Sequence, residues 1–219
     1  MSAFLGHIHF WLYKKIRLVI EREQLILDES EKRLDDLATE LHSTAVDIYG
    51  APIPADQPLD TIIDHSNIHG WLQSQIDTAS VREGTFIKDL LDCGGSDAEE
   101  AILTAFTTQG AACGTLAKEQ LTQVGGPQDI YQAMQDYYLN GMPCDGGDDI
   151  ISESEDAFIW EGNHKNQQPN WVKSGVDQRF MATAYQAWFK AFVNAADSDY
   201  EFVVEPKDGA FPLYKIVKK

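Results

Sequence analysis

The chain has 219 residues and a formal net charge of −18, from 35 acidic and 17 basic side chains. A chain of this length can bury a substantial core without a metal ion or a disulfide. The acidic surplus repels phosphate backbones, so it argues against nucleic-acid binding and predicts attraction of cations or of a basic protein partner.

The cysteines and the N-terminal segment indicate the cellular compartment in which we expect the protein. Cys93, Cys113 and Cys144 are odd in number and form no CxxC pair, so neither a disulfide framework nor a structural zinc knot is predicted. The first residues lack the long apolar core of a signal peptide, and no apolar run approaches the roughly 20 residues of a membrane span. We therefore expect a cytoplasmic protein without a membrane span.

The first predicted element is a long helix over about residues 4–48, whose apolar positions follow a coiled-coil-like spacing. Glu23 and Ser30 occupy two of these apolar positions. Glu23 is therefore either a buried carboxylate or lies beyond the end of the partner helix. The bundle would be completed within the chain or by a second copy, which makes a homodimer through the N-terminal helix an expectation.

Further helices are expected over about 59–79, 81–91, 96–121, 128–139 and 172–195. The helix from Ser96 has a capping box with Glu99 and small residues, among them Gly110 and Gly114, that favour close packing. Short strands are expected over 149–155, 157–160, 200–205 and 211–217.

These elements predict an α+β fold in a single domain over 1–219. We expect an N-terminal helical bundle with a long first helix over about 1–141. We expect a small antiparallel β-sheet packed with one C-terminal helix over about 142–219.

The phrase Ile-His-x-Trp-Leu occurs twice, at residues 8–12 and 68–72. Helical periodicity places His9 at the edge of an apolar stripe, and it places His65 and His69 within a second apolar sector at i, i+4. The two copies suggest a duplicated hairpin, although five residues do not establish one.

Three imidazoles on two apolar faces predict a metal site. Neutral imidazoles are ligands of Zn, Fe and Ni, and two histidines at i, i+4 present nitrogens to a common point. His9 would supply the third ligand and His164 is an outer candidate for a fourth. The alternative interpretation is that these are core histidines, each bonded to a carbonyl or a tyrosine.

Such a site would serve a metal-dependent hydrolase or a metal sensor. No Glu follows the first His of the His-x-x-x-His pair, unlike the zincin metalloproteases, so proteolysis is disfavoured. In a hydrolase a metal-activated water would be the nucleophile, and Glu161 and Asp64 are the candidate bases.

Two alternatives need no metal. Cys144 and His164 are a candidate nucleophile and base for a cysteine enzyme, although the acidic neighbours of Cys144 oppose thiolate formation. The other alternative is a non-catalytic small-molecule-binding or protein-interaction domain. Its candidate pocket-wall residues are Trp171 and Tyr137, from the aromatic-rich C-terminal half.

Overall fold

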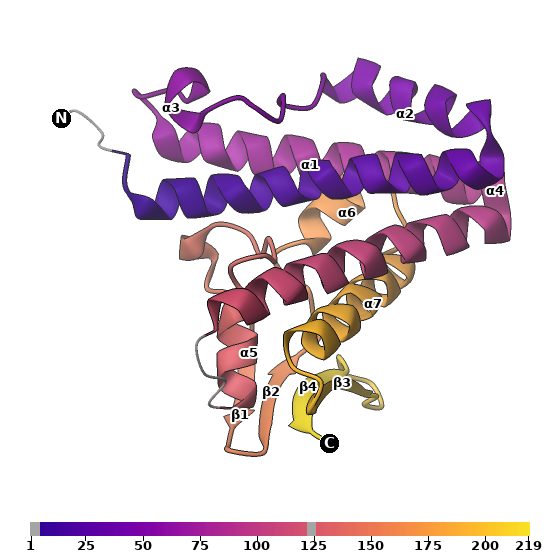
Figure 1. The fold of residues 1–219 in the computed structure, drawn as a ribbon. Coiled ribbons are helices and arrows are strands. Elements are labelled where there is room, and N and C mark those ends of the chain that lie inside the picture. The colour runs from indigo at the N-terminus through magenta and orange to yellow at the C-terminus, as the bar shows by residue number, and fades with distance from the viewer. Residues whose placement is uncertain (1–4, 122–125) are drawn as a thin grey trace. The chain divides into compact units, whose positions relative to one another are not determined.

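The computed structural model describes residues 5–121 and 126–219, which divide into two compact units. The first unit comprises residues 1–102 and 167–178, and the second comprises 103–166 and 179–219. Helices and a small antiparallel sheet make up both units together, so the predicted α+β class is confirmed (Figure 1). The expectation of a single domain stays a prediction.

The first unit is helical. It contains helices α1 (His7–Leu34), α2 (Asp36–Tyr49), α3 (Leu59–Ile62), the part of α4 (Ile68–Gln120) up to residue 102, and α6 (Gln168–Ser174).

The second unit carries the rest of α4 and the whole sheet. Its elements are helices α5 (Pro127–Met134) and α7 (Gln178–Ala196, of which 179–196 belong here), the 3-10 turn η1 (Pro143–Asp145), and strands β1 (Ile150–Glu153), β2 (Ala157–Glu161), β3 (Tyr200–Glu205) and β4 (Leu213–Lys218).

The first helix is shorter than predicted because Asp35 interrupts it. Asp35 has φ 49° and ψ −134°, a conformation that no helix contains, and α2 begins at the next residue. The backbone N–H of Asp35 still donates to the carbonyl of Glu31 and ends α1. As a result α2 folds back along α1 (Figure 1).

A second interruption occurs 60 residues later. Gly95 lies inside α4 with φ 54° and ψ −132°, nearly the values of Asp35, so α4 is two helices joined at Gly95. The two Ile-His-x-Trp-Leu phrases have the same 60-residue offset. The repeat therefore extends from the phrase to the helix break, and the duplicated hairpin that the phrase suggests stays a prediction.

Several identical residues at this offset also occupy matching environments, although Ile8 is exposed and Ile68 is buried. Ile16 and Ile76 are both buried, and the dipeptide Arg-Glu recurs at 22–23 and 82–83. Beyond the two breaks, Ala38 and Ala98 are both fully buried. We refer to residues 8–49 as the first copy and residues 68–109 as the second copy of the helical repeat.

The two Arg-Glu dipeptides join α1 to α4 by crossed ion pairs. Arg22 donates through Nε and Nη2 to the two carboxylate oxygens of Glu83, each at 2.8 Å, and Arg82 Nε lies 2.9 Å from both oxygens of Glu23. His42 of α2 places Nε2 2.8 Å from Glu23 as well. All four dipeptide side chains are buried, so Glu23 is the buried carboxylate that the sequence allowed.

The sheet of the second unit has the strand order β1-β2-β4-β3 with antiparallel pairs throughout. Its inward side chains form an aromatic core with α7. Trp160 of β2, Tyr214 of β4 and Phe202 of β3 gather around Phe189 with ring centroids 5.5–6.2 Å apart. The four predicted strands and their hairpins are confirmed within a few residues.

Two glycines allow α4 and α7 to pack closely. A Cβ atom on Gly110 would lie 2.4 Å from the carbonyl oxygen of Trp188, and one on Gly114 would lie 2.3 Å from that of Phe192. Only glycine permits this backbone approach. The predicted close packing of this small-residue helix is confirmed.

Other helix boundaries differ from the predictions. The helix expected over 172–195 is divided into α6 and α7, with Gly175 in a left-handed conformation at the end of α6. The helices expected over 59–79 and 81–91 are instead the short α3 and one uninterrupted helix from Ile68 to the Gly95 break. Over the described ranges, no helix combines the length and the apolar character that crossing a bilayer requires.

Candidate functional site

The predicted metal ligands His9, His65 and His69 lie at helix starts in the first unit. The Nδ1 atom of His9 accepts the backbone N–H of Gly6 at 2.9 Å. His65 is exposed in the turn before α4, with Nε2 3.2 Å from the carbonyl oxygen of Asp60. His69 is exposed in the first turn of α4.

The helical pairing of His65 with His69 is not formed. The helix expected over 59–79 begins anew at Ile68, so His65 lies outside it, and the expectation that both side chains face the core is wrong. Within residues 5–121 and 126–219, no group of three or more His, Cys, Asp and Glu side chains is arranged to hold a metal ion. Binding of Zn, Fe or Ni stays a prediction of the sequence.

His164 belongs to the second unit and is buried there with 5% of its surface exposed. Its Nε2 lies 2.9 Å from the hydroxyl oxygen of Tyr214, and its Nδ1 lies 3.5 Å from that of Tyr138. Gln186 donates to the same Tyr214 oxygen, which leaves the hydroxyl proton of Tyr214 for Nε2. Burial lowers the pKa of His164 to about 4, so the ring is neutral at pH 7.

The backbone of His164 has φ 49°, in the left-handed region that residues other than glycine rarely adopt. Its ring contacts Tyr138 and Tyr214. This arrangement matches the alternative interpretation of a core histidine satisfied by tyrosines.

The candidate base Glu161 lies near this histidine in the chain but faces a polar cluster. Asn163 donates through Nδ2 to Glu161 and to Asp149, each at 2.8 Å. Next to them, Asp148 accepts the hydroxyl of Tyr131 and the amide of Asn140, and burial raises the pKa of Asp148. The hydrogen bond from Asn163 to Asp149 joins the loop after β2 to the loop before β1.

The remaining catalytic candidates lie in turns. Asp64 accepts the backbone N–H and the hydroxyl of Ser66, and these bonds lower its pKa. Cys144 is exposed, with Sγ 3.9 Å from Asp145. His164 instead contacts tyrosines, so the structure gives no support to a Cys144–His164 pair.

The two predicted pocket-wall residues have different environments. Trp171 is buried within α6 of the first unit, with 4% of its surface exposed. Tyr137 lies after α5 in the second unit and forms one wall of a hollow of about 370 Å³. This hollow is the candidate functional site.

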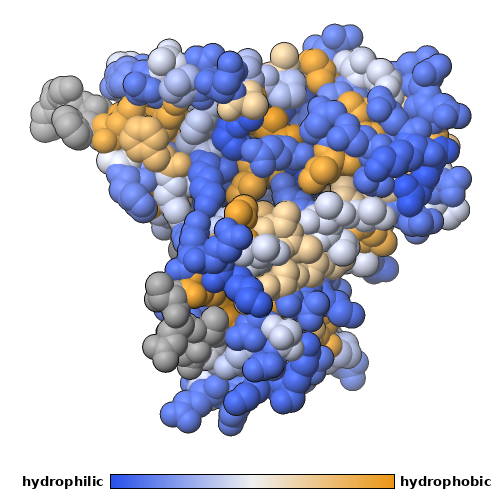
Figure 2. Space-filling model, viewed as in Figure 1, coloured by the Kyte–Doolittle hydropathy of each residue, from blue (hydrophilic) through white to orange (hydrophobic). Residues whose placement is uncertain are grey.

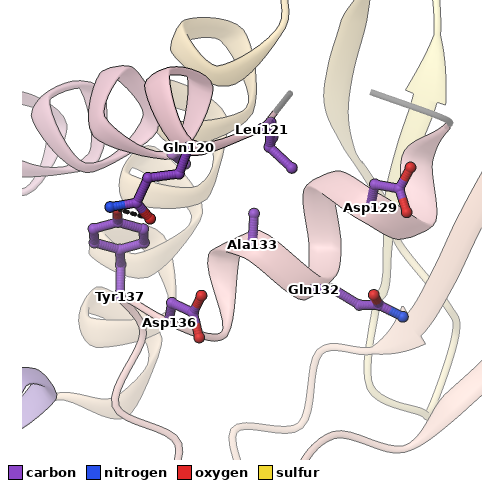
Figure 3. A pocket seen from close by; sticks show the side chains of 8 residues that line it. Gln120, Leu121, Asp129, Gln132, Ala133, Asp136 and Tyr137 are labelled. Carbon is purple, nitrogen blue, oxygen red and sulfur yellow. Dashed lines mark hydrogen bonds between the residues drawn. The ribbon is translucent and has the colours of Figure 1, made fainter. Parts of the chain in front are cut away.

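The hollow lies between the end of α4 and α5 (Figure 3). From α5 come Asp129, Gln132 and Ala133, which at i, i+3 and i+4 share one helical face, and Asp136 follows in the turn after the helix. The end of α4 supplies the opposite wall with Ala117, Gln120 and Leu121. We call these residues, together with Tyr137, the acidic hollow.

Tyr137 fixes the two walls of the acidic hollow to each other. Its hydroxyl donates to the side-chain oxygen of Gln120 at 3.2 Å, the dashed line in Figure 3. Burial raises the pKa of the Tyr137 hydroxyl, and nearby Cys113, Asp136 and Glu119 raise it further.

A second hollow of about 400 Å³ adjoins the first at Asp129, which lines both. It lies between the start of α5 and the β1–β2 turn, where Glu153 and Glu155 provide two more carboxylates. Figure 2 shows mainly hydrophilic residues at the bottom of the view, where Figure 1 shows the β1–β2 turn. Among the described residues that line the two hollows there are four carboxylates and no Lys, Arg or His.

Sequence patterns indicate part of this site. Tyr137 is a predicted pocket-wall residue, the acidic surplus predicts attraction of cations, and Asp129 and Asp136 lie within the helix predicted over 128–139. The contribution of Gln120 depends on how the end of α4 meets α5, which no local pattern indicates.

Comparisons with known proteins give no family for this chain: no family model matches it, and neither a curated protein nor a solved structure is similar to it.

Proposed function

We propose that the protein is a non-catalytic binding module that receives a cationic group, such as a lysine or arginine side chain of a basic partner, in the acidic hollow. The observation that carries the proposal is the lining: two half-buried carboxylates, two amides and a tyrosine surround about 370 Å³, and no basic side chain is among the lining residues that the structure describes. The volume is within the range of ordinary ligand sites.

The local electrostatics favour a cation over a neutral or anionic ligand. Asp129 lies on α5 and Asp136 in the turn after it, and both line the hollow, so a bound cation would lie near two charges of the same sign. Partial burial strengthens such an interaction because the effective dielectric constant is lower than in water. The amide oxygens of Gln120 and Gln132 are further acceptors for the N–H groups of a guanidinium or ammonium.

The adjoining hollow favours a partner with more than one positive charge. Glu153 and Glu155 continue the negative surface beyond Asp129. The net charge of −18 adds long-range attraction, which speeds the encounter with a basic partner. A short basic peptide segment has the charges and the reach to occupy both hollows.

Isothermal titration calorimetry with a tetra-arginine peptide tests this proposal. The variant D129N/D136N removes two charges and leaves the shape of the acidic hollow. We expect it to bind at least about tenfold more weakly, because each charged hydrogen bond contributes about 1.5–3 kcal/mol.

The matched control is E40Q/D47N, which removes the same charge from exposed positions of α2. We expect this control to bind within about twofold of the unchanged protein. Equal weakening in both variants would mean that only the net charge acts, and would contradict a site at the hollow.

A further inference from the structure

A third hollow of the second unit has the opposite character. It is a groove of about 580 Å³ beside the close contact of α4 and α7, and most of its wall is apolar. Its residues are distinct from those of the acidic hollow. We call it the alanine groove, after the residues Ala111, Ala187, Ala191 and Ala195 that line it.

The alanine groove follows from the sequence of α7. Ala187, Ala191 and Ala195 recur every four residues and line the groove over two helical turns, about 12 Å at 1.5 Å per residue. Gly110 and Gly114 bring α4 against the same helix, and Ala111 of α4 forms the facing wall. The buried ring of Phe202 from β3 completes the apolar lining.

Two lysines line this apolar groove. Lys190 is exposed on the groove face of α7, and it forms no hydrogen bond or ion pair with the described part of the chain. Lys219 Nζ donates to the carbonyl oxygen of Ser198 at 2.7 Å and lies 3.4 Å from the side-chain oxygen of Asn194. These contacts hold the ammonium at the groove and leave one of its three N–H donors for an anion.

The charge balance of the groove is unusual for this chain. Its lining has two lysines and one carboxylate, Glu201, whereas the whole chain has about two acidic residues for each basic one. An apolar wall with cationic groups beside it complements a molecule that has a hydrocarbon part and one negative charge.

We propose that the alanine groove binds a linear-chain carboxylate, with the alkyl chain along the three alanines of α7 and the carboxylate near Lys190 and Lys219. The alkyl chain would cover apolar surface that water now contacts, which favours binding. The carboxylate would receive charged hydrogen bonds from the lysines, which fixes the direction of the chain in the groove.

The test is calorimetric titration with decanoate below its micelle concentration, beside neutral decanol and cationic decyltrimethylammonium. We expect saturable binding of one decanoate per chain and at least about tenfold weaker binding of the other two probes. Decanol binding as tightly as decanoate would overturn the role of the lysines. Absence of saturable decanoate binding would overturn the site.

Three variants test where decanoate binds. We expect K190Q/K219Q to weaken decanoate binding at least about tenfold, and K118Q, at an exposed lysine on α4, to leave it within about twofold. A191W fills the groove and should abolish binding, with thermal unfolding measured to show that the variant is folded. Undiminished binding to a folded A191W or to K190Q/K219Q would place decanoate elsewhere and contradict the proposal.

Discussion

The two units stabilise their buried polar groups in different ways. The first unit buries charges and pairs them, since Arg22 and Glu83, and Arg82 and Glu23, are joined across the helical repeat. The second unit buries a neutral histidine among tyrosines. The first arrangement depends on both partners being charged, and the second depends on its histidine remaining uncharged.

This difference separates stability from binding. The charge pairs of the first unit hold helices together, whereas all three hollows described above are lined by residues of the second unit. We therefore expect the core of the first unit to be sensitive to the loss of one charge and its surface to be unimportant for ligands. The second unit should respond to pH in its core and to substitutions in its hollows.

The largest expected effect is on the crossed ion pairs. Arg22→Ala leaves Glu83 buried without its bidentate partner, so we expect the free energy of unfolding to fall by about 3–5 kcal/mol. Chemical denaturation measures it. The control is Arg33→Ala, whose partner Glu100 is exposed and whose loss should cost less than about 1 kcal/mol. Similar losses in both variants would show that burial of the pair has no special importance.

The next effect is the acid sensitivity of the second unit. The pKa of His164 is about 4 in the folded state and about 6.5 when unfolded, so protonation favours the unfolded chain. Its stabilising contribution is present above pH 6.5 and is lost as the pH falls through 6.5 toward 4, by about 3 kcal/mol in total.

His164→Asn tests this pH dependence, because asparagine tolerates the left-handed backbone and does not titrate. We expect the variant to be less stable at pH 7 and to lose less stability between pH 7 and pH 4 than the unchanged protein. Denaturation midpoints at the two pH values give the comparison. An unchanged pH dependence would show that His164 is already protonated or exposed.

The smallest effect concerns the two helix breaks of the repeat. Asp35 adopts nearly the backbone conformation of Gly95, where an L side chain is strained. Asp35→Gly should therefore stabilise the protein by about 1 kcal/mol after the entropy cost of glycine.

The matched variant is Gly95→Ala. A Cβ there would meet nothing within 4 Å, so the variant reports backbone strain alone, and we expect a loss of about 1–3 kcal/mol. Thermal unfolding measures both variants. If Asp35→Gly destabilises instead, Asp35 has a structural role that its glycine counterpart lacks.

The sequence predicted the elements better than their ends. Apolar spacing indicated the helices and the strands, because burial of one face imposes that spacing. It missed the break at Asp35, since aspartate is not a residue that usually signals such a conformation. The second break lies between the helices predicted over 81–91 and 96–121, where Gly95 gives a clear signal.

The candidate site was less predictable than the fold. Helical periodicity places His65 on the same helix as His69, but that helix begins only at Ile68, so the predicted i, i+4 pairing is not formed. The acidic hollow combines residues of α4 with residues of α5 and of the turn after it. The alanine groove combines residues of α4 and α7 with β3 and Lys219. Such combinations arise from tertiary packing, which a single sequence does not specify.

The central claim is that a cation occupies the acidic hollow of the second unit. Ala133→Arg tests it most directly, because the variant places a guanidinium in the hollow, while Ala112→Arg adds the same charge at an exposed position of α4. Tetra-arginine binding is measured by calorimetry for both folded variants. We predict that Ala133→Arg abolishes binding and that Ala112→Arg preserves it within about twofold. Equal affinities in the two variants would contradict the claim.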